Sequence, residues 1–341
     1  MDLDTLHKGR QTIVFDRHPV ILAHSAIAGK KESEGPLAGF FDHTETDTRF
    51  GQKTWEKAET RLQELALDTA RSKAQLQYSD LDVLFAGDLL NQCISSAFAI
   101  RDTRIPFLGL YGACSTMAES LTLAAAAVNA GYAVRAAALT SSHFATAERQ
   151  YRFPLGYGGQ RTPTAQWTVT GSGCCIVGAE GSGPFINCAT IGRIEDYGIK
   201  DANNMGAAMA PAAYSTLRAH FADTGLRPQD YDLIVTGDLG TLGSTIVTDL
   251  FQRDGVEFGA NYRDCGVLIY DLKRQDVHAG GSGCGCGASV LCGYLLRQLR
   301  EKKINSLLFC ATGALMSPVS TWQGESIPAI CHAISISNER R

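Results

Sequence analysis

The pattern Asp82-Val-Leu-Phe-Ala-Gly-Asp-Leu89 occurs twice in this chain and returns 150 residues later as Asp232-Leu-Ile-Val-Thr-Gly-Asp-Leu239. Each copy is a short apolar run closed by Gly-Asp, which predicts a buried strand that leads into a turn. A helical pattern precedes each copy, and the first covers residues 54–75. Thr54 and Asn204 both suit the N-cap of these helices. Because the strand recurs together with its helix, we expect an internal duplication.

Further matches extend the repeat beyond this strand, now at a spacing of 172 residues. Four residues of the first half have an identical partner in the second half: Gly109, Cys114, Leu123 and Thr140 match Gly281, Cys286, Leu295 and Thr312. Strands therefore alternate with apolar or amphipathic helices in both halves. This order is typical of parallel βα units.

Two of the predicted helices are unusually apolar. The helix over 115–129 is apolar nearly all round, so we expect it to be buried on all sides. Its counterpart near 288–300 is more polar only at its end. Two such helices indicate a layered structure in which helices lie between two sheets.

Composition narrows the possible functions. The chain has 341 residues with 31 basic and 35 acidic side chains, a balance that argues against a nucleic-acid-binding protein. With 45% apolar and 19% charged residues it is expected to fold, and its length suggests two domains. The start of the chain lacks the apolar segment of a signal peptide, and Glu119 interrupts the longest low-charge stretch, 105–134. We therefore expect neither a signal peptide nor a transmembrane helix.

Cysteine usage points to buried thiols. There are eleven cysteines and no CxxC pair, so neither a disulfide framework nor a structural zinc site is expected. Cys114 is the exception, because Leu110-Tyr-Gly-Ala-Cys-Ser-Thr116 joins a predicted strand to the apolar helix. At a helix N-terminus, unpaired amides and the helix dipole lower a thiol pKa. Cys114 is thus either a nucleophile or a small residue at a crowded position.

Several motifs of the chain resemble those of known protein families. The duplicated βα pattern, Gly-Ala-Cys-Ser at a buried helix start and the Gly-rich strand over 171–178 resemble the thiolase and ketosynthase superfamily. Longer segments resemble the stage V sporulation protein AD family. They include Ala86-Gly-Asp-Leu-Leu-Asn-Gln92, Phe107-Leu-Gly-Leu-Tyr-Gly-Ala-Cys-Ser-Thr116, Thr140-Ser-Ser-His-Phe-Ala-Thr-Ala-Glu-Arg-Gln150, Met209-Ala-Pro-Ala-Ala213 and Ala279-Gly-Gly-Ser-Gly-Cys284.

The resemblance implies an α/β thiolase-like fold. Two duplicated βα halves, 1–200 and 201–341, would form a five-layer α-β-α-β-α sandwich. It also implies a sporulation role in the spore inner-membrane apparatus that moves dipicolinic acid into the forespore. The chain would lie peripherally at that membrane beside other stage V sporulation A-group membrane proteins. It would bind dipicolinic acid rather than condense acyl groups, and calcium would arrive with the ligand, without a resident cofactor or metal site.

The residues themselves argue against condensation. That chemistry needs a thiolate, a general base and oxyanion donors. The stretches where ketosynthases carry these groups read Thr236-Gly-Asp-Leu-Gly240 and Gly280-Gly-Ser-Gly283, without histidine or asparagine. Gly237 and Ser282 occupy the expected catalytic positions. The main alternative is a thiolase-like acyltransferase that uses Cys114 as nucleophile and His143 as base.

Residues for a planar dicarboxylate can be chosen by their chemistry. Ser142 and His143 follow the predicted strand 136–141, whose carboxyl end is expected to open towards the cleft. Charge-assisted bonds are expected from Arg149 and Gln150, and an apolar wall from Tyr157. Backbone amides near Cys114 and over Gly281, Ser282 and Gly283 are further anion donors.

Two more expectations concern assembly. A homodimer is expected, because thiolase-like sheets usually pair across an edge strand, here predicted near 136–142. A third possible role is a structural subunit that only scaffolds other sporulation proteins.

Overall fold

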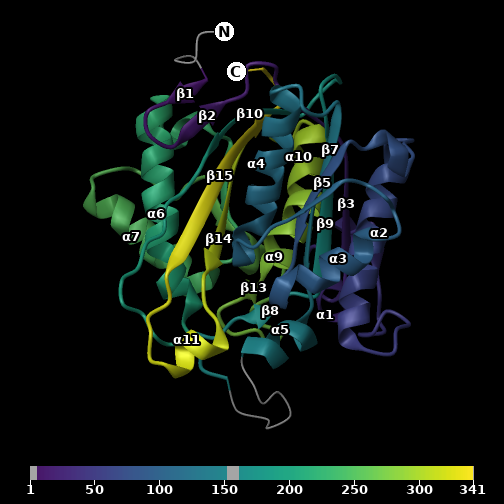
Figure 1. Cartoon of the computed structure of the whole chain (residues 1–341). Coiled ribbons are helices and arrows are strands. Elements are labelled where there is room, and N and C mark those ends of the chain that lie inside the picture. The colour runs from purple at the N-terminus through teal and green to yellow at the C-terminus, as the bar shows by residue number, and fades with distance from the viewer. Residues whose placement is uncertain (1–5, 152–160, 341) are drawn as a thin grey trace.

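The computed structural model describes residues 6–151 and 161–340, and in them the principal sheet runs in the order β12-β11-β14-β15-β10-β3-β9-β7-β5-β6 (Figure 1). Its main strands are β3 (Val20–Ala28), β5 (Val83–Gly87), β6 (Phe107–Gly109), β7 (Arg135–Ser142), β9 (Gly171–Gly178), β10 (Phe185–Thr190), β11 (Leu233–Thr236), β12 (Tyr262–Asp264), β14 (Ser306–Ala314) and β15 (Ala329–Ser337). Shorter strands are β1 (His7–Lys8), β2 (Thr12–Val14), β4 (His43–Thr44), and the separate pair β8 (Trp167–Thr168) and β13 (Gly281–Ser282).

The helices alternate with these strands. They are α1 (Lys30–Ser33), α2 (Trp55–Lys73), α3 (Ile94–Ile100), α4 (Thr116–Asn129), α5 (Phe144–Tyr151), α6 (Met205–Thr224), α7 (Gly240–Arg253), α8 (Cys265–Leu268), α9 (Cys284–Ser289), α10 (Leu296–Arg300) and α11 (Pro318–Trp322). A π-helical segment, Val290–Leu295, joins α9 to α10, so the predicted helix 288–300 is one continuous helical stretch.

The strand pairing shows the duplication directly. In the first half β6, β5 and β7 are parallel, β9 is antiparallel to β7, and β3 is antiparallel to β9. In the second half β12, β11 and β14 are parallel, and β15 and β10 continue antiparallel. The two half-sheets join where Phe185 of β10 pairs with Val20 of β3. β10, which precedes residue 200, is thus part of the second half-sheet. The domain division at residue 200 stays a prediction.

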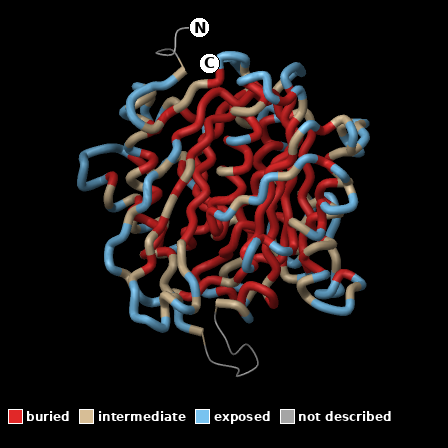
Figure 2. The backbone as a smooth tube through the Cα atoms, viewed as in Figure 1, coloured by how far each residue is buried: buried red, intermediate tan, exposed pale blue. Residues whose placement is uncertain are grey.

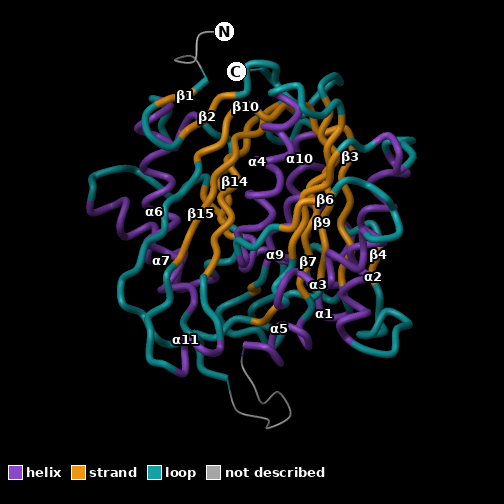
Figure 3. Tube along the Cα trace, viewed as in Figure 1, coloured by secondary structure: helices purple, strands orange, loops and turns teal. Residues whose placement is uncertain are grey.

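The predicted five layers are confirmed. Figure 1 shows the half-sheet with β14 and β15 covered outside by α6 and α7, and the other half-sheet covered by α2 and α3. Between the half-sheets lie α4, α9 and α10, which Figure 3 shows as helices flanked by strands on both sides. The buried residues concentrate in these three inner layers (Figure 2).

The central helix α4 differs from the prediction in one respect. Most of its residues are buried, but Leu123 is 37% exposed and Glu119, Ala126 and Ala127 are half-buried. These residues recur at helical spacing, so α4 leaves one narrow stripe open. The hydrophobic pattern of the helix could not predict this stripe, because it does not show which parts of the chain pack against each face.

The two predicted helix N-caps, Thr54 and Asn204, have different outcomes. Thr54 caps α2, since its hydroxyl accepts a hydrogen bond from the Lys57 N–H at 3.3 Å, as predicted. Asn204 lies at the N-cap position of α6 but its side chain makes no capping hydrogen bond.

The predicted dimer edge near 136–142 is wrong. That segment is β7, which pairs with β5 on one side and β9 on the other, so it has no free edge. The last strands of the sheet are instead β6 and β12. Among the described residues, no helix has the length and hydropathy needed to cross a membrane.

Candidate functional site

Cys114 sits in a tight turn between β6 and α4. A 3-10 turn, Ala113–Ser115, precedes the first residue of α4, and Ala113 has a left-handed φ of +49°. Two hydrogen bonds hold this turn: the Ser115 hydroxyl donates to the Gly112 carbonyl and the Thr116 hydroxyl to the Ala113 carbonyl, both at 2.7 Å. A left-handed alanine costs roughly 1–3 kcal/mol, and such strain concentrates at functional sites.

The thiol lines a narrow cavity between the two halves. Its walls include Leu89, Tyr111, Ala147, Glu148, Tyr151, Thr168, Met205, Ser282, Gly283, Ala314 and Met316. The volume is about 40 Å³. Because one water needs roughly 10–15 Å³, this space holds at most a few waters. Of the predicted site residues, Cys114, Ser282 and Gly283 come together here.

Asp238 hydrogen-bonds to three residues that line this cavity and so connects several segments. Its carboxylate accepts hydrogen bonds from the Gly283 N–H and the Thr312 hydroxyl, both at 2.9 Å, and from the Ser282 hydroxyl at 3.3 Å. It also accepts one from the Cys114 thiol. Complete burial raises the pKa of Asp238 to about 6, although these donors oppose the rise. Asp238 is thus the link between the thiol and the glycine-rich turn.

The repeated Gly-Asp pattern predicted only a turn and did not place Asp238 in the site. In the structure another residue, Asp264, accepts hydrogen bonds from the Leu239 and Gly240 N–H groups at 2.9 and 3.0 Å. The second copy of the Gly-Asp pattern was the available signal for Asp238. Its partners come from three distant segments, and that information is absent from the local sequence.

The thiol pKa contradicts the prediction made from the helix end. Burial raises the pKa of Cys114 well above its ordinary value, and the neighbouring Asp238 carboxylate and Cys284 raise it further. The Gly283 N–H lowers it, but the opposing effects are larger. Desolvation and a like charge therefore outweigh the turn and helix amides. Cys114 is held as a protonated thiol and is a weak nucleophile.

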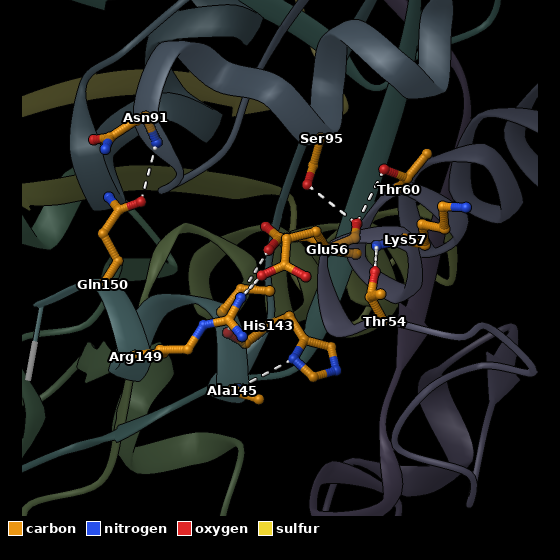
Figure 4. A network of polar contacts seen from close by, with 12 residues as sticks. Thr54, Glu56, Lys57, Thr60, Asn91, Ser95, His143, Ala145, Arg149 and Gln150 are labelled. Carbon is orange, nitrogen blue, oxygen red and sulfur yellow. Dashed lines mark hydrogen bonds and ion pairs between the residues drawn. The ribbon is translucent and has the colours of Figure 1, made fainter. Parts of the chain in front are cut away.

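His143 does not lie with Cys114. One ring nitrogen, Nε2, donates to the Thr48 carbonyl at 2.7 Å. The other, Nδ1, accepts from the Ala145 N–H at 3.1 Å (Figure 4). Burial lowers its pKa, so the ring is neutral. It lines a different cavity, between α1 and α5. Both nitrogens are engaged in this arrangement, which fixes the ring at the start of α5.

The predicted residues on α5 lie at a third place. Figure 4 shows Arg149 directed at Glu56 of α2, with which it forms an ion pair. Gln150 donates to the Leu89 carbonyl at 2.9 Å and accepts from the Asn91 N–H at 3.2 Å. Both line a surface pocket next to residues 90–94 rather than the Cys114 cavity.

The remaining predicted residues support the walls. The buried Ser142 hydroxyl donates to the Val169 carbonyl at 2.7 Å and accepts from the Gly285 N–H at 3.0 Å. The Gly281 carbonyl accepts from the Gln166 amide at 2.7 Å. Gly283 has a φ of +96°, and a Cβ there would lie 2.7 Å from the Ser142 hydroxyl oxygen, so only glycine fits. Tyr157 lies outside the described residues.

Metal ligands are not gathered at any of these places. Within residues 6–151 and 161–340, no three histidine, cysteine, aspartate or glutamate side chains come together as a metal site. The carboxylates near Cys114 are instead occupied by protein donors.

Comparison with known proteins gives the family. Residues 9–337 match the family model for stage V sporulation protein AD. The stage V sporulation protein AD of Bacillus subtilis (strain 168) is 47% identical over 327 residues, which are 96% of both chains. The chain belongs to the stage V sporulation protein AD family.

Solved structures agree with the fold of this stage V sporulation protein AD family member. The cerulenin-bound OleA of Xanthomonas campestris has a TM-score of 0.61 and 13% identity, and the match covers 95% of this chain and 97% of that one. The 3-oxoacyl-[acyl-carrier-protein] synthase III of Aquifex aeolicus VF5 has a TM-score of 0.58 and 12% identity, with 94% and 99% covered. At these identities the likeness shows the fold alone. The predicted family and thiolase-like fold are confirmed, and the role lies in sporulation.

Proposed function

We propose that this family member binds dipicolinic acid, as its calcium chelate, in the Cys114 cavity and does so without covalent chemistry. The contact between the Cys114 thiol and the Asp238 carboxylate carries this proposal. Burial and this contact together raise the thiol pKa and keep the thiol protonated, in a site where there is no histidine among the described lining residues. A retained cavity with an inactive thiol suits binding better than acyl transfer.

Charge around the cavity favours the chelate over the free ligand. Glu148 lines the cavity and Asp238 hydrogen-bonds to three of its lining residues, while no lysine or arginine is among its described lining residues. Free dipicolinate carries two negative charges at neutral pH, and these would face acidic neighbours. Its calcium chelate is neutral, so it avoids this repulsion. Calcium would therefore enter with the ligand.

The walls must separate for a pyridine ring to enter. A cavity that binds benzene measures roughly 150 Å³, well above the space here. Met205 and Met316 form part of the wall, and unbranched methionines change rotamer easily. The Tyr151 hydroxyl donates to the Leu89 carbonyl at 2.7 Å, so the Tyr111 hydroxyl donates to Tyr151, and a ligand carboxylate would have to replace one of these acceptors.

Isothermal titration with dipicolinate, with and without calcium, tests this proposal. Cys114→Leu should weaken chelate binding at least tenfold by filling the cavity, whereas Cys114→Ser should retain it. Cys188→Leu is a matched control, because Cys188 on β10 has the same 7% exposure and lies outside the cavity lining. Equal affinity in Cys114→Leu and the wild type, with both folded by circular dichroism, would refute the site.

The acyltransferase alternative needs a base that the geometry does not supply. His143 lines another cavity and uses both ring nitrogens. The same titration also tests the scaffold role, because a folded chain that binds neither form of dipicolinate would favour that role.

The proposal includes a homodimer beside the other stage V sporulation A-group membrane proteins, at the spore inner membrane. Support for the dimer comes from β6, a free sheet edge, where Leu108 is 55% exposed next to the exposed rings of Phe98 and Tyr111. Leu108→Glu should shift the protein from dimer to monomer in analytical ultracentrifugation. Val134→Glu, at another exposed apolar residue, should leave the dimer intact. A monomeric wild type would contradict this part.

A further inference from the structure

A second and larger cavity lies on the other side of α5. It measures about 610 Å³, and its walls include Lys30, Lys31, Trp55, His143, Phe144 and Trp167. The thin partition between the two cavities consists of α5 and β8. Ala147 and Thr168 face the Cys114 cavity, whereas Ala145 and Trp167, two and one residues earlier, face the larger one.

The partition gives this cavity an aromatic wall. Phe144 and Trp167 stack with ring centroids 4.0 Å apart and planes inclined by 16°. Trp55, the first residue of α2, contributes a second indole. Two of the three tryptophans of the chain therefore line one cavity. Flat apolar walls of this kind suit a planar ring, because ring faces pack on indole and phenyl groups.

The lining of the cavity carries two lysines, Lys30 and Lys31, beside two acids, Glu32 and Glu34. Lys31 Nζ lies 4.0 Å from the centroid of the Trp167 ring, and the Arg49 guanidinium lies 5.4 Å from that of Trp55. Within the described residues, Lys30, Lys31 and Arg49 form no ion pair. Lys31 already acts electrostatically on Glu32, and Arg49 on Asp47, but neither cation holds a described carboxylate at ion-pair distance, so a ligand carboxylate can still pair with them.

The interior of the cavity contains a buried acid with an unused oxygen. Glu32 is 1% exposed, and its Oε1 accepts hydrogen bonds from the Tyr270 hydroxyl and, at 3.1 Å, from the Thr170 N–H. Its Oε2 has no hydrogen-bond partner among the described residues. Burial raises the pKa of Glu32 to about 7, so near neutrality much of it is protonated. The acid then opposes an anionic ligand only weakly and has a proton to donate.

We propose that this cavity is a second binding site, which takes a planar aromatic carboxylate between Trp55 and the Phe144–Trp167 pair, with its carboxylate on Lys30 and Lys31. The site is independent of Cys114, and the choice of dipicolinate as its probe rests on the proposed function. Its two lysines can pair with the carboxylates of the free anion, whereas no lysine or arginine is among the described lining residues of the Cys114 cavity. We therefore expect the free dicarboxylate in this cavity and the calcium chelate in the Cys114 cavity.

Intrinsic fluorescence of the full chain tests this site. In a Trp322→Phe background, the signal comes from Trp55 and Trp167 alone, because Trp322 is the third tryptophan and lies 79% exposed on α11. Calcium-free dipicolinate should change this signal saturably. The Lys30→Ala/Lys31→Ala variant should raise the apparent Kd at least tenfold. The Lys302→Ala/Lys303→Ala variant, another adjacent pair outside the cavity, should leave it unchanged.

The outcomes separate the second site from the proposed function. The fluorescence change should persist in Cys114→Leu, whatever that variant does to chelate binding. A signal that is lost in Cys114→Leu and unchanged in the Lys30/Lys31 variant would overturn the second site and leave the proposed function standing. A different result is a heat of chelate binding that is the same in Cys114→Leu and in the wild type, with a fluorescence change that still depends on Lys30 and Lys31. That result would overturn the proposed function alone. No fluorescence change with free dipicolinate would overturn the second site.

Discussion

The two Gly-Asp loops began as copies and now have different tasks. Asp88, after β5, accepts from the Leu90 N–H at 2.9 Å and from the Ser96 N–H and hydroxyl at 2.8 and 2.7 Å. All these donors lie within eight residues of it. Asp238, after β11, instead bonds to β13, to β14 and to the Cys114 thiol of the other half. One loop stabilises itself, and the other connects the halves.

Asp264 supplies the local hydrogen bonds of the second loop, which leaves Asp238 to connect the two halves. It accepts from Leu239 and Gly240 at the start of α7, and its other bonds reach the Thr236 hydroxyl at 2.7 Å and the Val267 N–H at 3.3 Å. Gly240 is the counterpart of Leu90, whose N–H donates to Asp88 in the first loop. A duplicated fold can thus reassign a residue when a neighbour takes over its structural hydrogen bonds.

Asp264→Ala should give the largest effect, a loss of about 3 kcal/mol of unfolding free energy, because several buried donors lose their acceptor. Urea unfolding followed by circular dichroism measures it. Asp249→Ala, on the exposed face of α7, is the control and should change stability by less than about 0.5 kcal/mol. Similar losses in the two variants would mean that Asp264 has not replaced Asp238 as the local cap.

Asp238→Asn should change the reactivity of Cys114. Without the carboxylate, the thiol pKa falls, and a fall of one unit gives about tenfold faster alkylation. Mass spectrometry of the Cys114 peptide after timed iodoacetamide treatment follows the rate. Asp88→Asn should leave it unchanged, since Asp88 serves its own loop. Equal rates in the wild type and Asp238→Asn would remove the proposed link between acid and thiol.

Asp238→Asn should also change how the stability of the protein depends on pH. The pKa of Asp238 rises from 3.8 to about 6 on folding, so the folded state holds a proton that the unfolded chain releases. This preference stabilises the fold below pH 4 and is lost as the pH rises towards 6. The stability of the wild type relative to Asp238→Asn should therefore fall over that interval. Denaturant titrations at several pH values measure it, and a constant difference would contradict the raised pKa.

The smallest effect concerns the helices that precede the two strands. Thr54→Ala should cost about 1 kcal/mol, because the α2 cap loses its acceptor. Asn204→Ala should cost clearly less, since Asn204 makes no capping bond. Thermal unfolding of both variants checks this difference. Equal losses would show that the two helix starts are still equivalent.

Much of the fold could be predicted from the sequence. The repeated Gly-Asp strand and the apolar helix after Cys114 indicated the two halves and the central layer, because period and hydrophobicity are local properties. The dimer edge was misplaced, since the sequence of β7 does not state which strands flank it.

The site was predicted only in part, for geometric reasons. On α5, Ala147, Glu148 and Tyr151 face the Cys114 cavity, while Arg149 and Gln150 face another pocket. Neighbouring helix residues point about 100° apart, so sequence proximity to the cavity does not ensure contact. The raised pKa of Cys114 depends on burial and on the approach of Asp238, and both arise only from tertiary packing.

The central claim is that Cys114 is kept as a protonated thiol in a binding site. The most direct measurement is the mass of the protein after incubation with acetyl-, malonyl- and octanoyl-coenzyme A. We expect an unchanged mass with all three donors. An added acyl group located on the Cys114 peptide would contradict the account.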